Sequence, residues 1–346
     1  MIVLGIESSC DELAFAVLDS DGLTLRASVV HSQIDLHAQF GGVVPEVASR
    51  DHVIRLGPVL RSALEAAGLA LTDIDGIAVT AGPGLIGPLL CGVEFAKGLA
   101  LALDRPLIGV NHLEGHIAAA FLDTGAASLA PPFVALLVSG GHTSLIRVEA
   151  LGGPYSHLGA TRDDAAGEAF DKTAKLLGLG YPGGVAIDHI AADGDPKAVA
   201  FPKMMPGKDN LDFSFSGLKT DAARRIREMG GPPEGEALAD FCASFREAIV
   251  DNLLKKAFRA VEKCDVSQLV LAGGVAANSR LREKAVERGR RSGVEVFLPS
   301  RAFCTDNAAM IAKAGHVRLS RGESNGLDLA ARAHWPLVDI PKRKRR

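Results

Sequence analysis

Cysteine is scarce in this chain and never occurs in a metal-binding pair. Among 346 residues there are five cysteines, and no two of them have the CxxC spacing. Their scattered positions exclude a zinc ribbon and a disulfide framework, because both need cysteines in pairs. Unpaired cysteines are typical of a reducing compartment, and we therefore expect a cytoplasmic protein.

Long hydrophobic runs and an excess of charge of one sign are also missing. Apolar runs such as residues 98–103 are shorter than a membrane span, and residues 1–6 lack the basic start of a signal peptide. We expect no membrane association. The formal net charge of −3 means that any surface that binds nucleic acid must be local. The arginine-rich candidates are residues 224–227, 280–291 and 342–346.

Strand and helix patterns recur in two similar halves, as expected for a chain too long for one hydrophobic core. Each half begins with consecutive strands and continues with alternating helices and strands. The initial strands are expected at residues 2–6, 13–18 and 23–30 and at 133–138 and 143–148. This order predicts an α/β protein with two mixed sheets that carry helices on their faces.

Two prolines, Pro131 and Pro132, interrupt the pattern between the halves. We therefore expect an N-terminal domain at residues 1–128, a C-terminal domain at 129–335 and a basic disordered tail at 336–346. The main helices are expected at residues 45–67, 88–103, 165–177, 236–263, 277–289 and 306–318.

Glycine is abundant, with 38 residues, and forms four turns that connect expected strands and helices. Backbone N–H groups exposed in such turns bind phosphate oxygens. A single turn of this kind is commonly only a tight connection, but four in equivalent places of two halves predict a nucleotide site. A GxxxxGK[ST] motif is missing, which excludes a P-loop enzyme. The four turns lie at residues 5–12, 139–142, 180–184 and 273–274.

His112 and His116 are four residues apart and follow an apolar run at residues 106–110. On a helix the two rings share one face and can ligate one metal ion. Two histidines on the solvent side of a helix start are the alternative. The pair differs from the zinc-peptidase signature, in which Glu follows the first His directly, because Leu113 precedes Glu114 here.

Nine ordered motifs resemble those of the bacterial TsaD family, tRNA threonylcarbamoyladenosine biosynthesis proteins formerly described as O-sialoglycoprotein endopeptidases or glycoproteases. The resemblance extends from residue 2 to about residue 320. It implies the superfold of actin, hexokinase and the heat-shock chaperone ATPases, with a nucleotide in the cleft between two related domains. The motifs are GIESSCDE (5–12), GGVVPEVASR (41–50), GPGL (82–85), NHLEGH (111–116), VSGGH (138–142), GEAFDK (167–172), FSFSGLK (213–219), AGGVAAN (272–278) and CTDNAA (304–309).

The resemblance also implies a function in tRNA processing. The enzyme would be a metal-dependent acyltransferase that moves the threonylcarbamoyl group from threonylcarbamoyl-AMP to N6 of adenosine 37 in tRNAs reading codons that begin with A, releasing AMP. One Fe²⁺ per subunit is implied, with Zn²⁺ as the alternative, and Mg²⁺ could accompany the nucleotide. The implied partners are tRNA, a non-catalytic paralogue of the same fold (TsaB) and a small P-loop ATPase (TsaE).

Site residues follow from the same motifs. His112, His116 and Asp306 would hold the metal, although Asp306 could instead cap the last helix. Asp11 and Glu12, in an acidic group with Glu7, are the catalytic candidates, with a plain turn role as the competing interpretation. The residues implied for the substrate and its nucleotide are Val138, Ser139, Gly140, Gly141, His142, Asp171, Gly184, Asp188 and Asn278.

Three other functions compete with this interpretation. A small-molecule kinase of the same superfold would use the glycine turns but would not need the histidine pair or Asp306. A metallopeptidase would use the metal but would leave the four turns unexplained. A non-catalytic scaffold would be expected to lose the metal ligands, all three of which are present.

Overall fold

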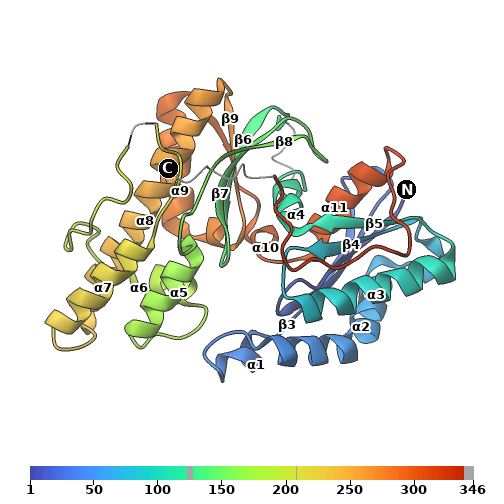
Figure 1. Cartoon of the computed structure of the whole chain (residues 1–346), viewed down its shortest axis with the longest axis horizontal. Helices are drawn as coiled ribbons and strands as arrows, with labels where there is room; N and C mark the ends of the chain where they lie inside the picture. The colour runs from blue at the N-terminus through green and yellow to red at the C-terminus, as the bar shows by residue number, and fades with distance from the viewer. Residues whose placement is uncertain (123–127, 208, 339–346) are drawn as a thin grey trace, which may run out of the picture. The chain divides into compact units, whose positions relative to one another are not determined.

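The structure, a computed structural model, describes residues 1–122, 128–207 and 209–338 of the chain (Figure 1). Contacts group the chain into two compact units, each containing one five-stranded sheet. The first unit comprises Met1–Leu129, Ala150–Tyr155 and Thr305–Arg346, and the second Ala130–Glu149 and Ser156–Cys304. The α/β class with two mixed sheets is confirmed. The limits of the domains stay a prediction, and residues 339–346 of the expected tail lie outside the described residues.

The sheet of the first unit has the strand order β3-β2-β1-β4-β5. Its first three strands form an antiparallel meander, and β4 and β5 run parallel to β1. Every residue of β1, β4 and β5 is buried, which explains why these strands are continuous apolar runs. The strands are β1 (Val3–Glu7), β2 (Glu12–Leu18), β3 (Leu25–Ser32), β4 (Gly76–Gly82) and β5 (Leu107–Asn111).

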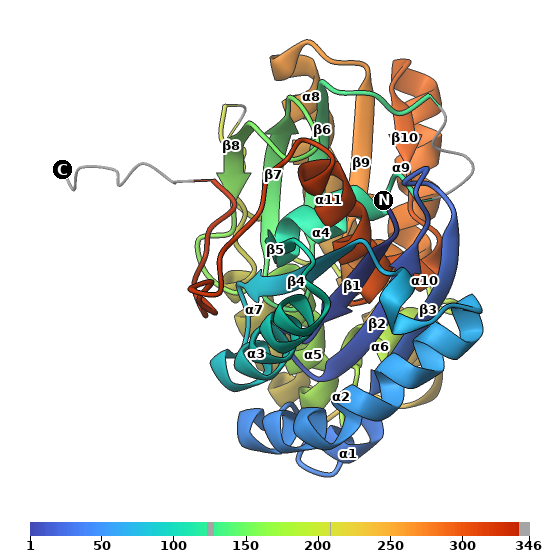
Figure 2. The ribbon, with the colours of Figure 1, turned by 90° about the vertical axis from the view of Figure 1, so that its right-hand side faces the viewer.

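Helices cover both faces of this sheet (Figures 1 and 2). Leu4 and Ile6 face the apolar core beneath α2 and α3, whereas Gly5 between them faces α11, because side chains alternate along a strand. The helices of this unit are α1 (Ile34–Ala38), α2 (Pro45–Ala67), η1 (Leu71–Asp73), α3 (Ile86–Leu103), α4 (His112–Ala119) and α11 (Ala308–Leu319).

Helix α11 approaches the sheet and α4 closely because glycines line the contacts. A Cβ atom on Gly5 would collide with the backbone oxygen of Ala308 and would lie 2.7 Å from the Ala312 nitrogen. A Cβ on Gly315 would collide with Ala78 of β4. On α4, a Cβ on Gly115 would lie 2.7 Å from the Ile311 side chain. Residues far apart in the sequence are therefore held at backbone distance.

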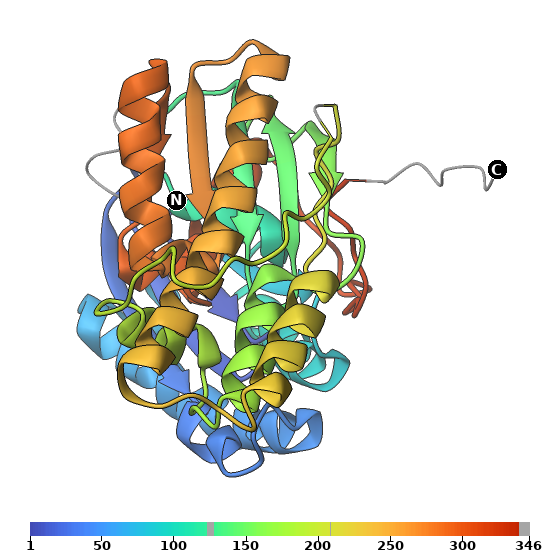
Figure 3. The same ribbon diagram turned by 90° about the vertical axis from the view of Figure 1, so that its left-hand side faces the viewer.

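The second unit repeats the plan, with the strand order β10-β9-β6-β7-β8. Strand β6 pairs antiparallel with β7 and parallel with β9, so β6 and β9 end at the same edge of the sheet. The long helix α8 packs on β6, β7 and β9, with α9 beside it (Figure 3). The strands are β6 (Phe133–Val138), β7 (Thr143–Val148), β8 (Tyr155–Ala160), β9 (Gln268–Ala272) and β10 (Glu295–Phe297). The helices are α5 (Ala166–Leu176), α6 (Gly183–Ile190), α7 (Ser216–Glu228), α8 (Gly235–Cys264), η3 (Gly274–Ala277), α9 (Ser279–Ser292) and α10 (Arg301–Cys304).

Several elements differ from the sequence expectation, among them the short helices α1 and α10, which were not expected. Strand β8 was not expected, because only one of its six residues is fully buried and its apolar pattern is weak. Helix α3 merges short apolar runs into an 18-residue helix that is long and apolar enough to cross a membrane by length and composition alone. The expectation that every run is too short is therefore wrong for α3. A core helix of a soluble protein passes the same test, and α3 packs against β4 and α2.

We expect Gly5→Ala to destabilise the first unit, because the added methyl group has no space between β1 and the backbone of α11. Overpacking of this kind costs roughly 1–3 kcal/mol or more, which corresponds to about 2–4 °C in Tm for each kcal/mol. Thermal unfolding followed by circular dichroism measures the change. Gly98→Ala is the matched control, because Gly98 lies in α3 with no atom within 4 Å of the place that its new methyl group would take, and it should raise stability slightly. Equal Tm values for the two variants would contradict the close packing of α11.

Candidate metal centre and nucleotide loops

His112 and His116 lie at the start of α4, directly after the buried strand β5. The side chain of Asn111 caps this helix by accepting a hydrogen bond from the Leu113 backbone at 3.0 Å. Every residue of α4 is buried, so the interpretation of two solvent-exposed histidines is wrong. The two ring centroids are 4.6 Å apart, on one face of the helix.

Asp306 completes a cluster with the two histidines inside the first unit. Its Oδ1 atom lies 3.5 Å from His112 Nε2 and 3.3 Å from His116 Nε2. One ligand atom from each residue lies within 4.8 Å of the others, which is close enough to hold one metal ion. The cap of α11 is the next residue, Asn307, which accepts from the Met310 backbone at 3.0 Å. The capping role considered for Asp306 therefore belongs to its neighbour.

The donor set fits a metal ion. His116 is 1 % exposed, and neither of its ring nitrogens makes a hydrogen bond of normal geometry to the described residues. A buried ring without hydrogen bonds is costly unless another ligand satisfies it. Two histidines and one carboxylate form a set that suits Fe²⁺ or Zn²⁺ and leaves coordination positions for a substrate. The identity of the ion stays a prediction.

Glu7, at the end of β1, orients His112. Its Oε2 atom lies 3.1 Å from His112 Nδ1 and accepts a 2.6 Å hydrogen bond from the Thr80 hydroxyl. Its Oε1 atom accepts from the Ser9 backbone at 2.6 Å. With Nδ1 donating to Glu7, the Nε2 atom of His112 is directed at Asp306, as in other sites where a carboxylate fixes a metal-binding histidine. Ser9 and Thr80 were missed by the sequence reasoning, although Ser9 lies within the first motif.

Opposite charges compete with burial in this cluster. Burial raises the pKa of Glu7, but the charge and hydrogen bond of His112 outweigh it and the pKa is lowered. Burial also favours the neutral form of Asp306, yet His112 and His116 hold the pKa of Asp306 well below its usual range. For His112, burial lowers the pKa, and Asp306 and Glu7 more than reverse the effect. The carboxylates are therefore anionic, as a metal ion requires.

Asp11 and Glu12 lie at the turn into β2, in the same unit. Asp11 is buried, and Glu12 is half-buried with its carboxylate 3.4 Å from the Ser32 hydroxyl, which donates to it. Burial, followed by the charges of Asp306 and Asp11, raises the pKa of Glu12 to about 9. In this arrangement Glu12 is a proton donor at neutral pH. Their catalytic roles stay a prediction.

Glu114, between the two histidines in sequence, points elsewhere. Its Oε2 atom lies 3.8 Å from the Arg318 guanidinium, and its side chain bonds to Tyr155. Burial raises the pKa of Glu114 despite the nearby positive charge of Arg318. This carboxyl group anchors α4 and does not serve the His–His–Asp cluster as a peptidase base would.

In the second unit, the predicted turn at residues 139–142 follows the end of β6. It is closed by a hydrogen bond of 2.8 Å from the Ser139 nitrogen to the His142 oxygen, and the Ser139 hydroxyl accepts from the His142 nitrogen at 3.1 Å. No atom lies within 4 Å of a methyl group built on Gly140 or Gly141. Space beside this backbone is what a phosphate-binding turn needs.

The other predicted loops of this unit adjoin that turn through close contacts. Gly273, at the end of β9, has a φ of 92°, and a Cβ there would lie 2.5 Å from the Val138 oxygen. Gly167, at the start of α5, donates to the Ser139 oxygen at 3.3 Å. The structure therefore brings the ends of β6 and β9 and the start of α5 together at one edge of the sheet, where ligands of α/β folds bind.

Three predicted polar residues of this site already have protein partners. Asp171 accepts from the Gly183 nitrogen at 2.8 Å, directly before Gly184, and burial raises the pKa of Asp171. Asp188 accepts from Arg246 at 2.8 Å and from the Ser279 nitrogen at 2.9 Å. Asn278 caps α9. These contacts link α5, α6 and α9, so the carboxylates position the loops whatever else they bind.

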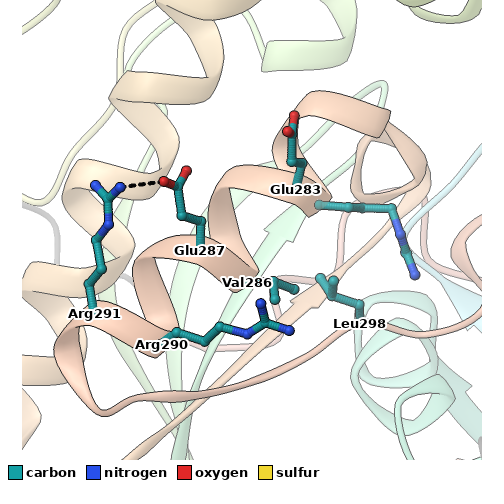
Figure 4. Close-up of a pocket in the computed structure, with 7 residues that line it drawn as sticks. Glu283, Val286, Glu287, Arg290, Arg291 and Leu298 are labelled. Carbon is teal, nitrogen blue, oxygen red and sulfur yellow. Dashed lines mark hydrogen bonds and ion pairs between the residues drawn. The ribbon is translucent and has the colours of Figure 1, made fainter.

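An open groove of about 650 Å³ lies along α9, within the segment 280–291 (Figure 4). None of the residues predicted to bind the metal or the nucleotide lines it, and it carries charges of both signs. Arg291 pairs with Glu287, and Arg282 donates to the Pro299 oxygen at 2.8 Å. The lining residues are Arg282, Glu283, Val286, Glu287, Arg290, Arg291 and Leu298.

The fold and the cluster define a class: a two-unit α/β protein with a His–His–Asp cluster that could hold a metal ion and glycine-rich loops at the ends of parallel strands. Comparison with known proteins makes the assignment specific. Residues 24–313 match TsaD, described as tRNA N6-adenosine threonylcarbamoyltransferase, and the chain belongs to this family.

Curated relatives with this name cover nearly the whole chain. One from Anaeromyxobacter sp. (strain Fw109-5) is 56% identical over 97% of this chain and 100% of its own length. Another, from Syntrophus aciditrophicus (strain SB), is 52% identical over 97% of this chain and 98% of its own. The relative from Geobacter sulfurreducens is 51% identical over 97% of both chains.

Solved structures show the fold alone. Component A of (R)-2-hydroxyglutaryl-CoA dehydratase from Acidaminococcus fermentans is 14% identical with a TM-score of 0.54, over 92% of this chain and 99% of that one. Full-length HypF in its phosphate- and nucleotide-bound form is 14% identical with a TM-score of 0.59, over 93% of this chain and 47% of that one. The actin-like ATPase fold expected from the sequence is confirmed.

We expect His116→Ala and Asp306→Asn each to remove the bound metal, because each takes one of three protein ligands from the site. Metal per chain, measured by mass spectrometry after gel filtration, should fall from about one to near zero. His31→Ala is the matched control, since His31 pairs with Asp51 in the same unit and is outside the cluster. Full metal content in both cluster variants would contradict the assignment.

Glu7→Gln should weaken metal binding by roughly 10–100-fold without removing a ligand, because the amide no longer orients His112 through a charged acceptor. Competition with a chelator measures the affinity. Asp51→Asn makes the same kind of change at the His31–Asp51 pair and should leave metal affinity unchanged. Wild-type affinity in Glu7→Gln would show that Glu7 does not support the site.

Proposed function

We propose that the chain transfers the threonylcarbamoyl group from threonylcarbamoyl-AMP to N6 of adenosine 37 in tRNAs that read codons beginning with A, releasing AMP. The observation that carries this proposal is the identity of 51–56% to relatives named tRNA N6-adenosine threonylcarbamoyltransferase, over nearly their full lengths. The presence of the whole His–His–Asp cluster favours an enzyme over a non-catalytic scaffold.

The reaction joins the N6 nitrogen to the carbamoyl carbon and breaks the bond from that carbon to the phosphate oxygen. An aromatic amine is a poor nucleophile, so the carbonyl must be polarised and the AMP leaving group must be held. His112, His116 and Asp306 would hold an iron or zinc ion, which supplies a Lewis acid for the acyl end of the donor. Glu7 keeps the His112 ring in position.

Asp11 and Glu12 are proposed to handle the proton that leaves the attacking amine. Both follow Glu7 after the connection between β1 and β2, and the charge of Asp306 contributes to the raised pKa of Glu12, which supports a role for Glu12 near the cluster. A bound cation would lower the pKa of Glu12 and make it available as an acceptor. We propose that the two carboxyl groups act as one acid–base pair.

The AMP end of the donor is proposed to bind the second unit. The open backbone of Gly140 and Gly141 suits the phosphate, with Val138, Ser139 and His142 shaping the turn. Asp171, Gly184, Asp188 and Asn278 would contact the nucleoside, with Mg²⁺ as a further cofactor. The contacts that fix α5, α6 and α9 to one another support a preformed nucleotide site there.

We further propose a cytoplasmic complex with a non-catalytic paralogue of the same fold and a small P-loop ATPase. Exposed apolar side chains on α2 and α3 support a protein partner on this face of the first unit, because water-exposed clusters of large apolar residues mark interaction sites. They are Val53, Ile54, Ile86, Leu90 and Leu101.

Reconstitution tests the activity directly. The pure chain with both partner proteins, ATP, unmodified tRNA and threonylcarbamoyl-AMP labelled in its threonine should give labelled tRNA and AMP. His112→Ala should lose both transfer and bound metal, whereas His31→Ala should retain both. An unlabelled tRNA together with cleavage of casein would overturn the proposal in favour of a peptidase.

A further inference from the structure

The described C-terminal segment after α11 crosses the edge of the first sheet. We call residues 325–335 the strap. The backbone nitrogen of Asn325 donates to the Leu107 backbone oxygen at 2.7 Å. Its side-chain oxygen accepts from the Gly109 backbone nitrogen at 2.8 Å. Further along, the Arg332 nitrogen donates to the Ala81 oxygen at 2.7 Å. Backbone hydrogen bonds therefore fix the strap along β5 and the end of β4 (Figure 1).

The end of the strap bonds to Asn111, the residue that precedes His112. The Asn111 side chain, which caps α4 immediately before His112, donates to the Trp335 oxygen at 2.9 Å. The Gly84 nitrogen donates to the Ala333 oxygen at 3.2 Å. Its neighbour Leu85 donates to the Ser9 oxygen at 2.8 Å. One connection joins the strap to Asn111, which precedes His112. The other runs through Gly84 and Leu85 to Ser9, whose hydroxyl lies 3.2 Å from His112 Nδ1.

Two side chains of the strap form a stack at this point. The Arg332 guanidinium lies 5.3 Å from the centre of the Trp335 ring. Trp335 is half-buried and packs against the apolar core of the first unit, whereas Arg332 is exposed. The exposed guanidinium of Arg332 therefore lies over an aromatic ring that the core holds in place. Trp335 is the one tryptophan of the chain, and aromatic residues make up 5% of the sequence.

We propose that the Arg332–Trp335 stack docks the acceptor base, an unpaired purine of the RNA substrate, next to the His–His–Asp cluster. This proposal rests on the proposed transfer to an adenosine of tRNA. Proteins recognise single-stranded RNA bases by stacking them on aromatic rings or on arginine planes. An acyl transfer to N6 needs the purine held beside the acyl donor. The Arg332–Trp335 stack is connected to the start of α4, because the Asn111 side chain, which caps α4, donates to the Trp335 backbone oxygen.

Tryptophan fluorescence tests the contact without any turnover. The full-length chain is titrated with an unmodified anticodon stem-loop hairpin and with a matched hairpin that is abasic at the acceptor position. Stacking should quench the Trp335 emission with the first hairpin and should leave it nearly unchanged with the second. Equal responses to the two hairpins, including no response to either, would overturn the proposal.

Kinetics in the reconstituted assay test the role in transfer. Trp335→Ala should lower kcat/KM for tRNA by about tenfold or more, the usual effect of losing one stacked base, and Trp335→Phe should retain most of it. Arg332→Lys keeps the charge but loses the plane, and should also be impaired. Arg26→Lys, at an exposed position of β3 on the opposite edge of the sheet, is the matched control.

If the strap had a purely structural role, substitutions in it would give different experimental results. It would lower Tm and metal content and would impair the use of threonylcarbamoyl-AMP and tRNA alike. We expect instead an unchanged KM for threonylcarbamoyl-AMP and unchanged metal content in Arg332→Lys. If both Arg332→Lys and Trp335→Ala kept the wild-type kcat/KM for tRNA, the proposed docking of the base on the stack would be wrong. Failure of the wild-type chain to label tRNA would overturn the proposed function, whereas the hairpin comparison would still decide the docking of the base.

Discussion

The close approach of α11 to β1, β4 and α4 is the constraint on which the metal centre depends. Asp306 lies just before this helix, and it reaches His112 and His116 because glycines remove the side chains that would separate the backbones. Gly115 within the histidine motif serves the same contact from α4. A protein interior cannot absorb even one extra methyl group at such contacts without a shift. The glycines therefore set the distance between ligands that come from opposite ends of the chain.

The same region shows how charge is managed in a buried site. Glu7 and Asp306 are carboxylates at positions where burial opposes ionisation, and they stay ionised because histidines and hydrogen-bond donors face them. Glu12 accepts only a long hydrogen bond from Ser32, and burial and the charges of Asp306 and Asp11 raise its pKa. Three carboxyl groups on neighbouring segments thus differ in protonation through their surroundings alone, a pattern typical of sites that divide ligand and acid–base duties.

The second unit has a five-stranded sheet like that of the first, but its polar loop residues bond mainly to neighbouring helices. Its polar loop residues link helices to one another: Asp171 holds the start of α6, and Asp188 joins α6 to α8 and α9. Asp171 and Asp188, which the resemblance implies for the substrate and its nucleotide, are therefore already engaged in the protein. The open backbone at Gly140 and Gly141 is the part left accessible, and a phosphate needs only such N–H groups.

The sequence by itself determined the two α/β halves, the histidine pair on one helical face and the turns at strand ends, since these depend on the periodicity and turn chemistry of neighbouring residues. It suggested Asp306 only through resemblance and left two roles open for it. Tertiary structure gave the cap to Asn307, turned Glu114 toward Arg318 and placed the Arg332 guanidinium over the Trp335 ring. These outcomes depend on which distant surfaces fit together, and no local pattern encodes that fit.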